Sequence, residues 1–336
     1  MHWTDRRQRF RAVLAGDQCI HPGSVFDPIS ARIAEELGFE VGMFAGSIAS
    51  FTVLGAPDLI VLTLTEFAQQ AYRINRAGKL PLLVDADHGY GNALNVMRTV
   101  QELETAGVAA MCIEDTLLPK AYGEKKPSLI SLEEGIGKMR AAVAAREDPS
   151  FVIVGRTSAA AIAGTEDVLR RAKAYEQAGV DALFFAGGVT REQLDAISSA
   201  VKLPLMMGGG RDGLDREYMA SRRVRVALQG HQPFSSAVQA VYNTLKALRE
   251  GTKPSALTGI ASSDMMAKVT RAQGYLAACG GIVSSGASII SGMIYARYGQ
   301  GAYYAMAVMA FSGAAIMWLA RRSVEAPHPQ SAASGG

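Results

Sequence analysis

The sequence contains few cysteines, little net charge and no basic run. Its three cysteines, Cys19, Cys112 and Cys279, lie far apart among 336 residues and lack metal-ligand spacing, which argues against a disulfide framework or a cysteine-based metal site. The formal net charge is only +3 and no block of lysine or arginine interrupts the chain, so we expect no nucleic-acid partner. The polar first residues form no apolar signal core; we therefore expect a cytoplasmic protein with reduced thiols.

What the chain does contain is a repeated unit. A polar amphipathic segment ends in Ala-Gly or Leu-Gly, and a short apolar run follows it, as at residues 36–44, 76–84, 105–113 and 177–185. Glycine is the residue expected directly after a helix. Continuous apolar strands that alternate with helices indicate a parallel sheet buried on both faces.

Four further apolar runs extend this pattern, at residues 18–20, 151–154, 203–206 and 224–228. The chain then has eight strand–helix units by about residue 250. That number of units in that length predicts an α/β fold of the (β/α)8 barrel type over roughly residues 10–250. A doubly wound open sheet remains the alternative, because periodicity cannot show whether a sheet closes.

The composition changes after the eighth unit. Residues 274–296 and 301–320 contain no charged residue, and each is about the ~20 residues that a bilayer span needs. We therefore predict a barrel at 1–270, a membrane-like helical hairpin at 271–322 and a disordered tail at 323–336. Residues 274–320 would associate with a membrane on this interpretation, and a buried soluble hairpin is the alternative.

Two aspartates end a predicted strand in "LLVDADHGYGN", residues 82–92. Asp85 and Asp87 are two residues apart, so their side chains would point the same way if the strand continued. Two like charges on one side are costly unless a cation lies between them. Divalent cations prefer carboxylate oxygens, which makes a metal site one interpretation and a solvated loop the other.

The residues that follow each strand of such a barrel form its active face. The next strand ends in Glu114 and Asp115; Glu114 is a further metal candidate, and Asp115 would face the opposite side if the strand continues. Arg156 follows the run "FVIVG" and could bind a substrate carboxylate bidentately or form a salt bridge with these acids.

Two further polar residues follow predicted strands. Ser47, after Gly46, offers a hydroxyl and neighbouring backbone N–H groups to an anionic oxygen, although a plain turn would use the same residues. His231 ends the eighth strand as an acid/base or binding group, or as a structural histidine. His88 has the same structural alternative.

The residues 85–120, "DADHGYGNALNVMRTVQELETAGVAAMCIEDTLLPK", resemble the signature of the isocitrate lyase/phosphoenolpyruvate mutase superfamily. The resemblance extends from "SVFDPISARIAEELGFEVGMFAGSIAS" through "GRTSA" to about residue 270. Within the superfamily the sequence is most similar to the branch that decarboxylates oxaloacetate, through "SVFDPISARIA", "IEDTLLP" and the "GH" that ends in His231. The resemblance implies a magnesium-bearing barrel, usually a homotetramer built as a dimer of dimers that exchange their last helix.

The same resemblance assigns roles to individual residues. It places Mg²⁺ on Asp85, with Asp87 and Glu114 holding its waters, and Asp58 in "GAPD" matches an active-site acid of the mutase relatives. The predicted catalytic residues are Asp85, Arg156 and His231; the predicted substrate contacts are Gly46, Ser47, Asp58, Arg156 and His231; the predicted metal ligands are Asp85, Asp87 and Glu114.

The expected activity is Mg²⁺-dependent decarboxylation of oxaloacetate, a small 2-oxo dicarboxylate, to pyruvate and CO2 through a metal-stabilised enolate. Lyases of the superfamily carry a Lys-Lys-Cys-Gly-His loop with a catalytic cysteine, whereas residues 119–126 contain no cysteine here. That difference argues against cleavage of isocitrate or methylisocitrate. The alternatives are a carbon–carbon lyase or hydrolase acting on a related di- or tricarboxylate, and a degenerate membrane-associated binding protein.

The C-terminal segment resembles a different family. Residues 271–304, "RAQGYLAACGGIVSSGASIISGMIYARYGQGAYY", are similar to the last two helices of major facilitator transporters. Two helices cannot form a transport path, so we do not predict transport.

Overall fold

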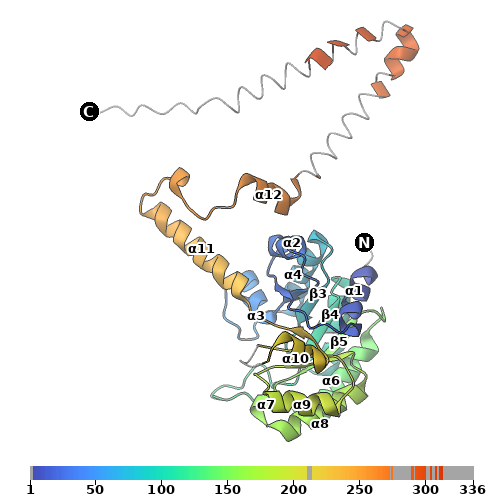
Figure 1. Ribbon diagram of the computed structural model, residues 1–336, viewed down its shortest axis with the longest axis vertical. Helices are drawn as coiled ribbons and strands as arrows, with labels where there is room; N and C mark the ends of the chain where they lie inside the picture. The colour runs from blue at the N-terminus through green and yellow to red at the C-terminus, as the bar shows by residue number, and fades with distance from the viewer. Residues whose placement is uncertain are drawn as a thin grey trace. The chain divides into compact units, whose positions relative to one another are not determined.

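The computed structural model describes residues 3–209, 214–272, 274, 289–290, 292–299, 303–304, 307–308 and 310–312. The chain divides into two compact units, Met1–Ala261 and Ser262–Gly336. The first unit holds a parallel sheet with helices around it (Figure 1).

Eight parallel strands pair in chain order, each with the next. They are β1 (Gly23–Ser24), β2 (Gly42–Phe44), β3 (Leu82–Asp85), β4 (Ala110–Glu114), β5 (Val152–Thr157), β6 (Ala182–Phe185), β7 (Leu205–Met207) and β8 (Val224–Ala227). A doubly wound sheet would reverse its strand order at a switch point, and this sheet does not. The α/β class and the eight parallel strands predicted from the sequence are therefore confirmed.

The first strand was predicted too early, at residues 18–20. Regular pairing with β2 begins only at Gly23, while Ile20 forms an isolated parallel bridge to Val226 of β8. Backbone hydrogen bonds of 2.9 Å run from Ile20 N to Arg225 O and from Ala227 N to Ile20 O. Pro22 has no N–H for a ladder between these two pairings. The segment around Ile20 thus joins the last strand, and β1 joins the second.

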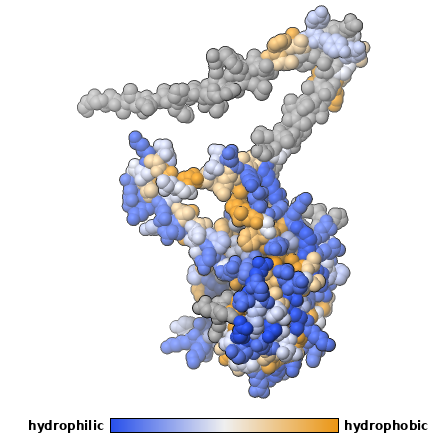
Figure 2. Space-filling view, in the orientation of Figure 1, coloured by the Kyte–Doolittle hydropathy of each residue, from blue (hydrophilic) through white to orange (hydrophobic). Residues whose placement is uncertain are grey.

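Helices follow the strands and cover the sheet. In the first unit they are α1 (Thr4–Ala15), α2 (Pro28–Glu36), α3 (Gly46–Ala49), the π-helix η1 (Ser50–Leu54), α4 (Leu64–Ala77), α5 (Ala93–Thr105), α6 (Leu132–Ala145), α7 (Ala159–Ile162), α8 (Thr165–Ala178), α9 (Arg191–Ala200), α10 (Arg216–Ser221), α11 (Gln232–Arg249) and the 3-10 helix η2 (Pro254–Ala256). Nearly all strand residues are buried, whereas the surface over α8 and α9 is mostly hydrophilic (Figure 2).

Capping residues fix where several helices begin. The side chains of Asp27, Thr63, Asn92 and Thr190 each accept a hydrogen bond from a backbone N–H in the first turn of α2, α4, α5 and α9. Each satisfies a donor that the helix itself leaves unpaired. Asn92 comes directly after the DADHGYG sequence, so it also fixes where that loop ends.

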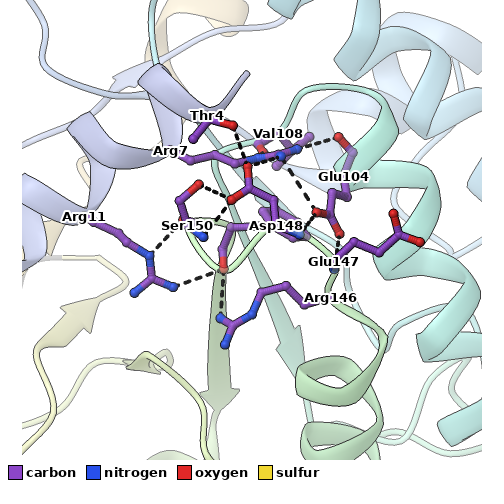
Figure 3. A network of polar contacts seen from close by, with 10 residues as sticks. Thr4, Arg7, Arg11, Glu104, Val108, Arg146, Glu147, Asp148 and Ser150 are labelled. Carbon is purple, nitrogen blue, oxygen red and sulfur yellow. Dashed lines mark hydrogen bonds and ion pairs between the residues drawn. The ribbon is translucent and has the colours of Figure 1, made fainter. Parts of the chain in front are cut away.

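Helix α1 covers the amino-terminal end of the sheet (Figure 3). Arg7 donates from Nε to Val108 O at 3.0 Å, just before β4, and from Nη1 to Asp148 Oδ2 at 2.8 Å, just before β5. Arg11 donates from Nη2 to Asp181 Oδ1 at 3.0 Å, just before β6. These contacts close one end of the sheet and leave the carboxyl ends of the strands for a site.

The predicted membrane-like hairpin falls mostly outside the described residues, as does the predicted disordered tail. The second unit includes α12 (Ser263–Thr270). In the part of the chain that the structure describes, no helix is both long and apolar enough to cross a membrane. Membrane association and the domain limits at residues 270 and 322 remain predictions.

Candidate active site

A cavity of about 370 Å³ lies at the carboxyl ends of the strands. Seven of the eight predicted site residues line it: Ser47, Asp58, Asp85, Asp87, Glu114, Arg156 and His231. The eighth, Gly46, packs against the Asp87 carboxylate. The rest of the wall is largely apolar and includes Met43, Ile60, Leu118, Phe184 and Leu228. Residues from nearly every strand–helix unit therefore meet where the sequence placed them.

Arg156 lies between two of the carboxylates. It is part of β5 rather than following the strand, and its Nη1 forms an ion pair with Asp85 Oδ2 and approaches Glu114 Oε1 to 3.6 Å. Burial alone would lower the pKa of this guanidinium, but the two carboxylates outweigh burial and raise it. The salt bridge that the sequence left as one interpretation of Arg156 is present. Binding of a substrate carboxylate by Arg156 remains a prediction.

Asp85 and Asp87 share the cavity, although the strand alternation used to predict this does not apply. Strand β3 ends at Asp85, and Asp87 has a left-handed φ of 47° with its N–H 3.3 Å from Asp85 Oδ1. The chain therefore turns after Asp85 instead of continuing as a strand. Burial, followed by the charges of Asp85, Asp58 and Glu114, raises the pKa of Asp87 well above its usual value.

The adjacent acids Glu114 and Asp115 face opposite sides, as predicted, although β4 ends at Glu114. Glu114 points into the cavity, where Oε2 accepts a 2.6 Å hydrogen bond from Thr116 Oγ1 and burial raises the pKa of the carboxyl group. Asp115 is fully buried on the other side. Its Oδ2 accepts hydrogen bonds from Tyr175 at 2.7 Å and from Arg171 at 3.1 Å, both on α8. Asp115 is thus part of the packing between sheet and helix.

The remaining predicted residues lie around the cavity wall. Ser47 is half-buried in α3. Asp58 is exposed as a residue, but its carboxyl group is partly buried, and this partial burial together with the charge of Asp85 raises its pKa. His231 Nδ1 lies 2.8 Å from Ser24 Oγ of β1, and burial lowers the pKa of this imidazole against the opposing charge of Asp85.

Sequence reasoning missed a thiol behind the acids. Cys112 of β4 pairs in register with Asp85 of β3, and its Sγ donates to Asp85 Oδ1 at 3.3 Å. The side chain is fully buried, and burial raises the pKa of the thiol well above its usual value. The alignment of β3 with β4 is the signal that would have revealed it. His88 is buried, and burial with the charge of Lys138 lowers its pKa to about 4, so its structural reading is the better supported.

The donor set fits a hydrated divalent cation better than a directly coordinated one. Four carboxylates, on Asp58, Asp85, Asp87 and Glu114, line the cavity, and the Arg156 guanidinium lies between two of them, Asp85 and Glu114. This leaves excess negative charge in a largely buried site, which a divalent cation would offset. Among the described residues, however, no three His, Cys, Asp or Glu side chains converge closely enough to hold a metal ion together. Mg²⁺ commonly keeps several waters and binds proteins through one or two carboxylates.

Comparison with known proteins gives consistent matches. The family model described as phosphoenolpyruvate phosphomutase matches residues 10–249. The chain is 59% identical over 272 residues to an oxaloacetate decarboxylase from Bradyrhizobium diazoefficiens, covering 81% of this chain and 94% of that protein. It is 58% identical over 272 residues to an oxaloacetate decarboxylase from Rhodopseudomonas palustris strain BisA53, with the same coverage.

Solved structures show the same relationship. Oxaloacetate acetylhydrolase in complex with 3,3-difluorooxalacetate superposes with a TM-score of 0.73 at 27% identity, covering 83% of this chain and 97% of that one. Phosphonopyruvate hydrolase in complex with oxalate and Mg²⁺ gives a TM-score of 0.71 at 27% identity, with 87% and 99% covered. These matches give no support to the transporter resemblance of residues 271–304.

Proposed function

The chain belongs to the phosphoenolpyruvate phosphomutase family, and we propose that within it the chain is a Mg²⁺-dependent oxaloacetate decarboxylase that forms pyruvate and CO2. The observation that carries this proposal is the 59% identity to an oxaloacetate decarboxylase over 94% of its length. The cavity supports it independently, because the residues predicted for this chemistry line one site. We also infer that the sheet, whose last strand bridges to Ile20, is a closed (β/α)8 barrel.

Asp85 would hold the metal directly, with Asp87 and Glu114 acting through waters. When bound, Mg²⁺ supplies a Lewis acid that polarises the 2-keto group and stabilises the enolate left by loss of CO2. A role for the metal is supported by the carboxylate excess in the cavity and by the Mg²⁺ in the phosphonopyruvate hydrolase structure.

The chain's own residues bind and orient the substrate. Arg156 offers a fork of donors that matches a carboxylate, and its buried Nε has no hydrogen-bond partner among the described residues. Ser47 and His231 line the same cavity and would hold further oxygens of a four-carbon dicarboxylate. No covalent nucleophile is required, which agrees with the absence of cysteine from residues 119–126.

The apolar wall suits the step in which CO2 leaves. The bond between C3 and the distal carboxylate breaks, and its electrons form the enolate. A carboxylate beside Leu118 and Leu228 would lose hydration without gaining a charged partner, which raises its free energy. The CO2 produced is uncharged, so it loses little hydration free energy in the same surroundings. The wall therefore favours the product over the bound carboxylate.

We further propose that the chain assembles into a homotetramer, a dimer of dimers, through α11. This helix extends away from the strands (Figure 1) and has no buried residue. Val238, Val241, Tyr242 and Leu245 recur at helical spacing and are each more than half exposed. A largely apolar groove of about 430 Å³ lies between α2 and the start of α11. A second copy of the chain would cover the exposed face, as is common for large apolar patches.

The test is pyruvate formation by the purified full-length chain from oxaloacetate and Mg²⁺, with a protein-free Mg²⁺ blank subtracted for decarboxylation by free metal. We expect turnover that a chelator abolishes and that Asp85→Ala lacks. Isocitrate and 2-methylisocitrate serve as competing substrates. Cleavage of either one faster than oxaloacetate decarboxylation would replace this proposal with a carbon–carbon lyase.

A further inference from the structure

The acid loop, residues 85–91, has an unusual backbone. Four of its residues have positive φ: Asp87 at 47°, Gly89 at 76°, Tyr90 at 61° and Gly91 at 147°. Glycine adopts such angles readily, but Asp and Tyr do so at a cost in free energy. Residues of this kind keep their conformation only when surrounding contacts hold them. The loop that carries Asp87 therefore needs external support.

Part of that support is a backbone hydrogen bond of 2.8 Å from Glu114 N to Asp87 O, and two side chains behind the loop add to it. Lys138 of α6 donates from Nζ to His88 O at 3.0 Å. The Thr99 hydroxyl of α5 shares its proton between Gly89 O and Asn95 O, each 3.0 Å from Oγ1. Their acceptors in the loop are the two carbonyls that directly follow Asp87. Neither side chain lines the cavity, so neither is placed to touch a substrate there.

Both donor side chains are buried in the packed interior of the protein. Thr99 is fully buried, and Lys138 is only 3% exposed. Burial lowers the pKa of the Lys138 ammonium, while the carboxylates of Glu134, Asp115 and Glu114 act in the opposite direction. A buried ammonium is expensive, and a long apolar side chain would fill the same space at lower cost. The hydrogen bond from Lys138 to His88 O partly offsets the cost of burying the ammonium, and an apolar side chain could not make it.

We propose that Lys138 and Thr99 are positioning residues for the metal site: they hold the carbonyls of His88 and Gly89 and thereby fix Asp87 where it can hold a hydrated divalent cation. The inference rests on the proposed function only in taking Asp87 as part of that site. Residues that orient metal-binding groups from behind typically affect metal affinity by about 10- to 100-fold.

Positioning and simple electrostatics predict opposite results for Lys138. If the lysine acted only through its charge, its removal would increase the attraction of the acid cluster for a cation. If it acts by fixing the loop, its removal weakens cation binding. Thr99 carries no charge, so Thr99→Val tests the positioning role without this competing effect.

The experiment measures Mn²⁺ binding to full-length protein by electron paramagnetic resonance, without substrate. Lys138→Met and Thr99→Val are compared with two matched controls. Thr99→Ser keeps the hydroxyl, and Arg140→Met removes an exposed charge from the same helix as Lys138. We expect the Kd for Mn²⁺ to rise about 10-fold or more in the first two variants and to stay at the wild-type value in the controls.

A second measurement reports on the loop without any metal. Hydrogen exchange of the backbone amides of residues 86–92 should be faster in Lys138→Met and Thr99→Val, while the amides of β5 stay protected. Unchanged Mn²⁺ affinity in Thr99→Val, or tighter binding by Lys138→Met, would overturn the inference. If the wild-type chain bound no Mn²⁺, both this inference and the metal proposal would fail. If it bound Mn²⁺ in the expected order but did not decarboxylate oxaloacetate, only the proposed function would fail.

Discussion

Gly46 leaves the space that the Asp87 carboxylate occupies. A Cβ at residue 46 would lie 2.4 Å from Asp87 Oδ2 and 2.6 Å from Oδ1, closer than any side-chain carbon can approach an oxygen. The two residues come from different strand–helix units, one at the start of α3 and the other after β3. Their contact couples the start of α3 to the acid loop.

Gly46→Ala should therefore disable the site more than it destabilises the fold. The added methyl group must displace Asp87 or the start of α3, and a shift of about 1 Å at such a site can cost about 100-fold in rate. The measurement is kcat/KM for oxaloacetate together with the midpoint of thermal unfolding. Gly137→Ala is the matched control, because a Cβ there meets nothing within 4 Å and alanine suits a helix better than glycine by up to about 1 kcal/mol. Full activity in Gly46→Ala would show that Asp87 need not occupy its present position.

Loss of charge at Glu114 should lower activity, whereas loss of charge at its neighbour Asp115 should lower stability. Glu114→Gln removes a carboxylate from the cavity, so we expect kcat/KM to fall about 10-fold or more with little change in unfolding free energy. Asp115→Asn weakens the buried contacts with Arg171 and Tyr175 and should lower the unfolding free energy by about 3 kcal/mol. Steady-state kinetics and urea denaturation of both variants check this. Equal losses of unfolding free energy in the two variants would contradict the assignment of Glu114 to the active site and of Asp115 to the packing between sheet and helix.

The Asp148 carboxylate should make stability depend on pH. Burial would raise the pKa of this group, but hydrogen bonds from Ser150, Arg7 and Thr4 outweigh burial and lower it. The folded-state pKa thus lies below the unfolded value of about 4, so the unfolded state binds more protons as pH falls. The stabilisation is fully present above about pH 4 and is lost progressively below it.

Asp148→Asn should accordingly lower the unfolding free energy by about 1–3 kcal/mol at neutral pH. The gap to wild type should narrow below about pH 4. Urea denaturation at several pH values measures it, with the exposed neighbour Glu147→Gln as the control. A gap that stayed constant down to about pH 3 would mean that the charge of Asp148 does not contribute.

The sequence predicted the chain order of strands and the grouping of the site, because both follow from local patterns. Alternation placed Glu114 and Asp115 on opposite faces, and the carboxyl ends of parallel strands necessarily lie together. Prediction from the sequence failed where the backbone departs from regular structure. The left-handed turn at Asp87 and the break at Pro22 have no periodic signal.

The supporting residues behind the site could not be predicted either. The contact of Cys112 with Asp85 depends on the register between β3 and β4, and that of Lys138 with His88 depends on how α6 packs. Both link residues at least 27 positions apart in the chain. Such contacts are set by tertiary packing, which no local pattern encodes.

Finally, Leu245→Arg should break the proposed assembly. Leu245 belongs to the exposed apolar face of α11 and is 62% exposed in the single chain, so the substitution should cost the isolated chain little. In an assembly the same position would be buried, and an unpaired buried charge costs about 3–5 kcal/mol. Light scattering after size-exclusion chromatography should then show a smaller species than wild type. Asn243→Arg, on the opposite side of the helix, adds the same charge and should leave the assembly intact. If both variants keep the wild-type mass, α11 does not form the interface; if both dissociate, the added charge acts without regard to the apolar face.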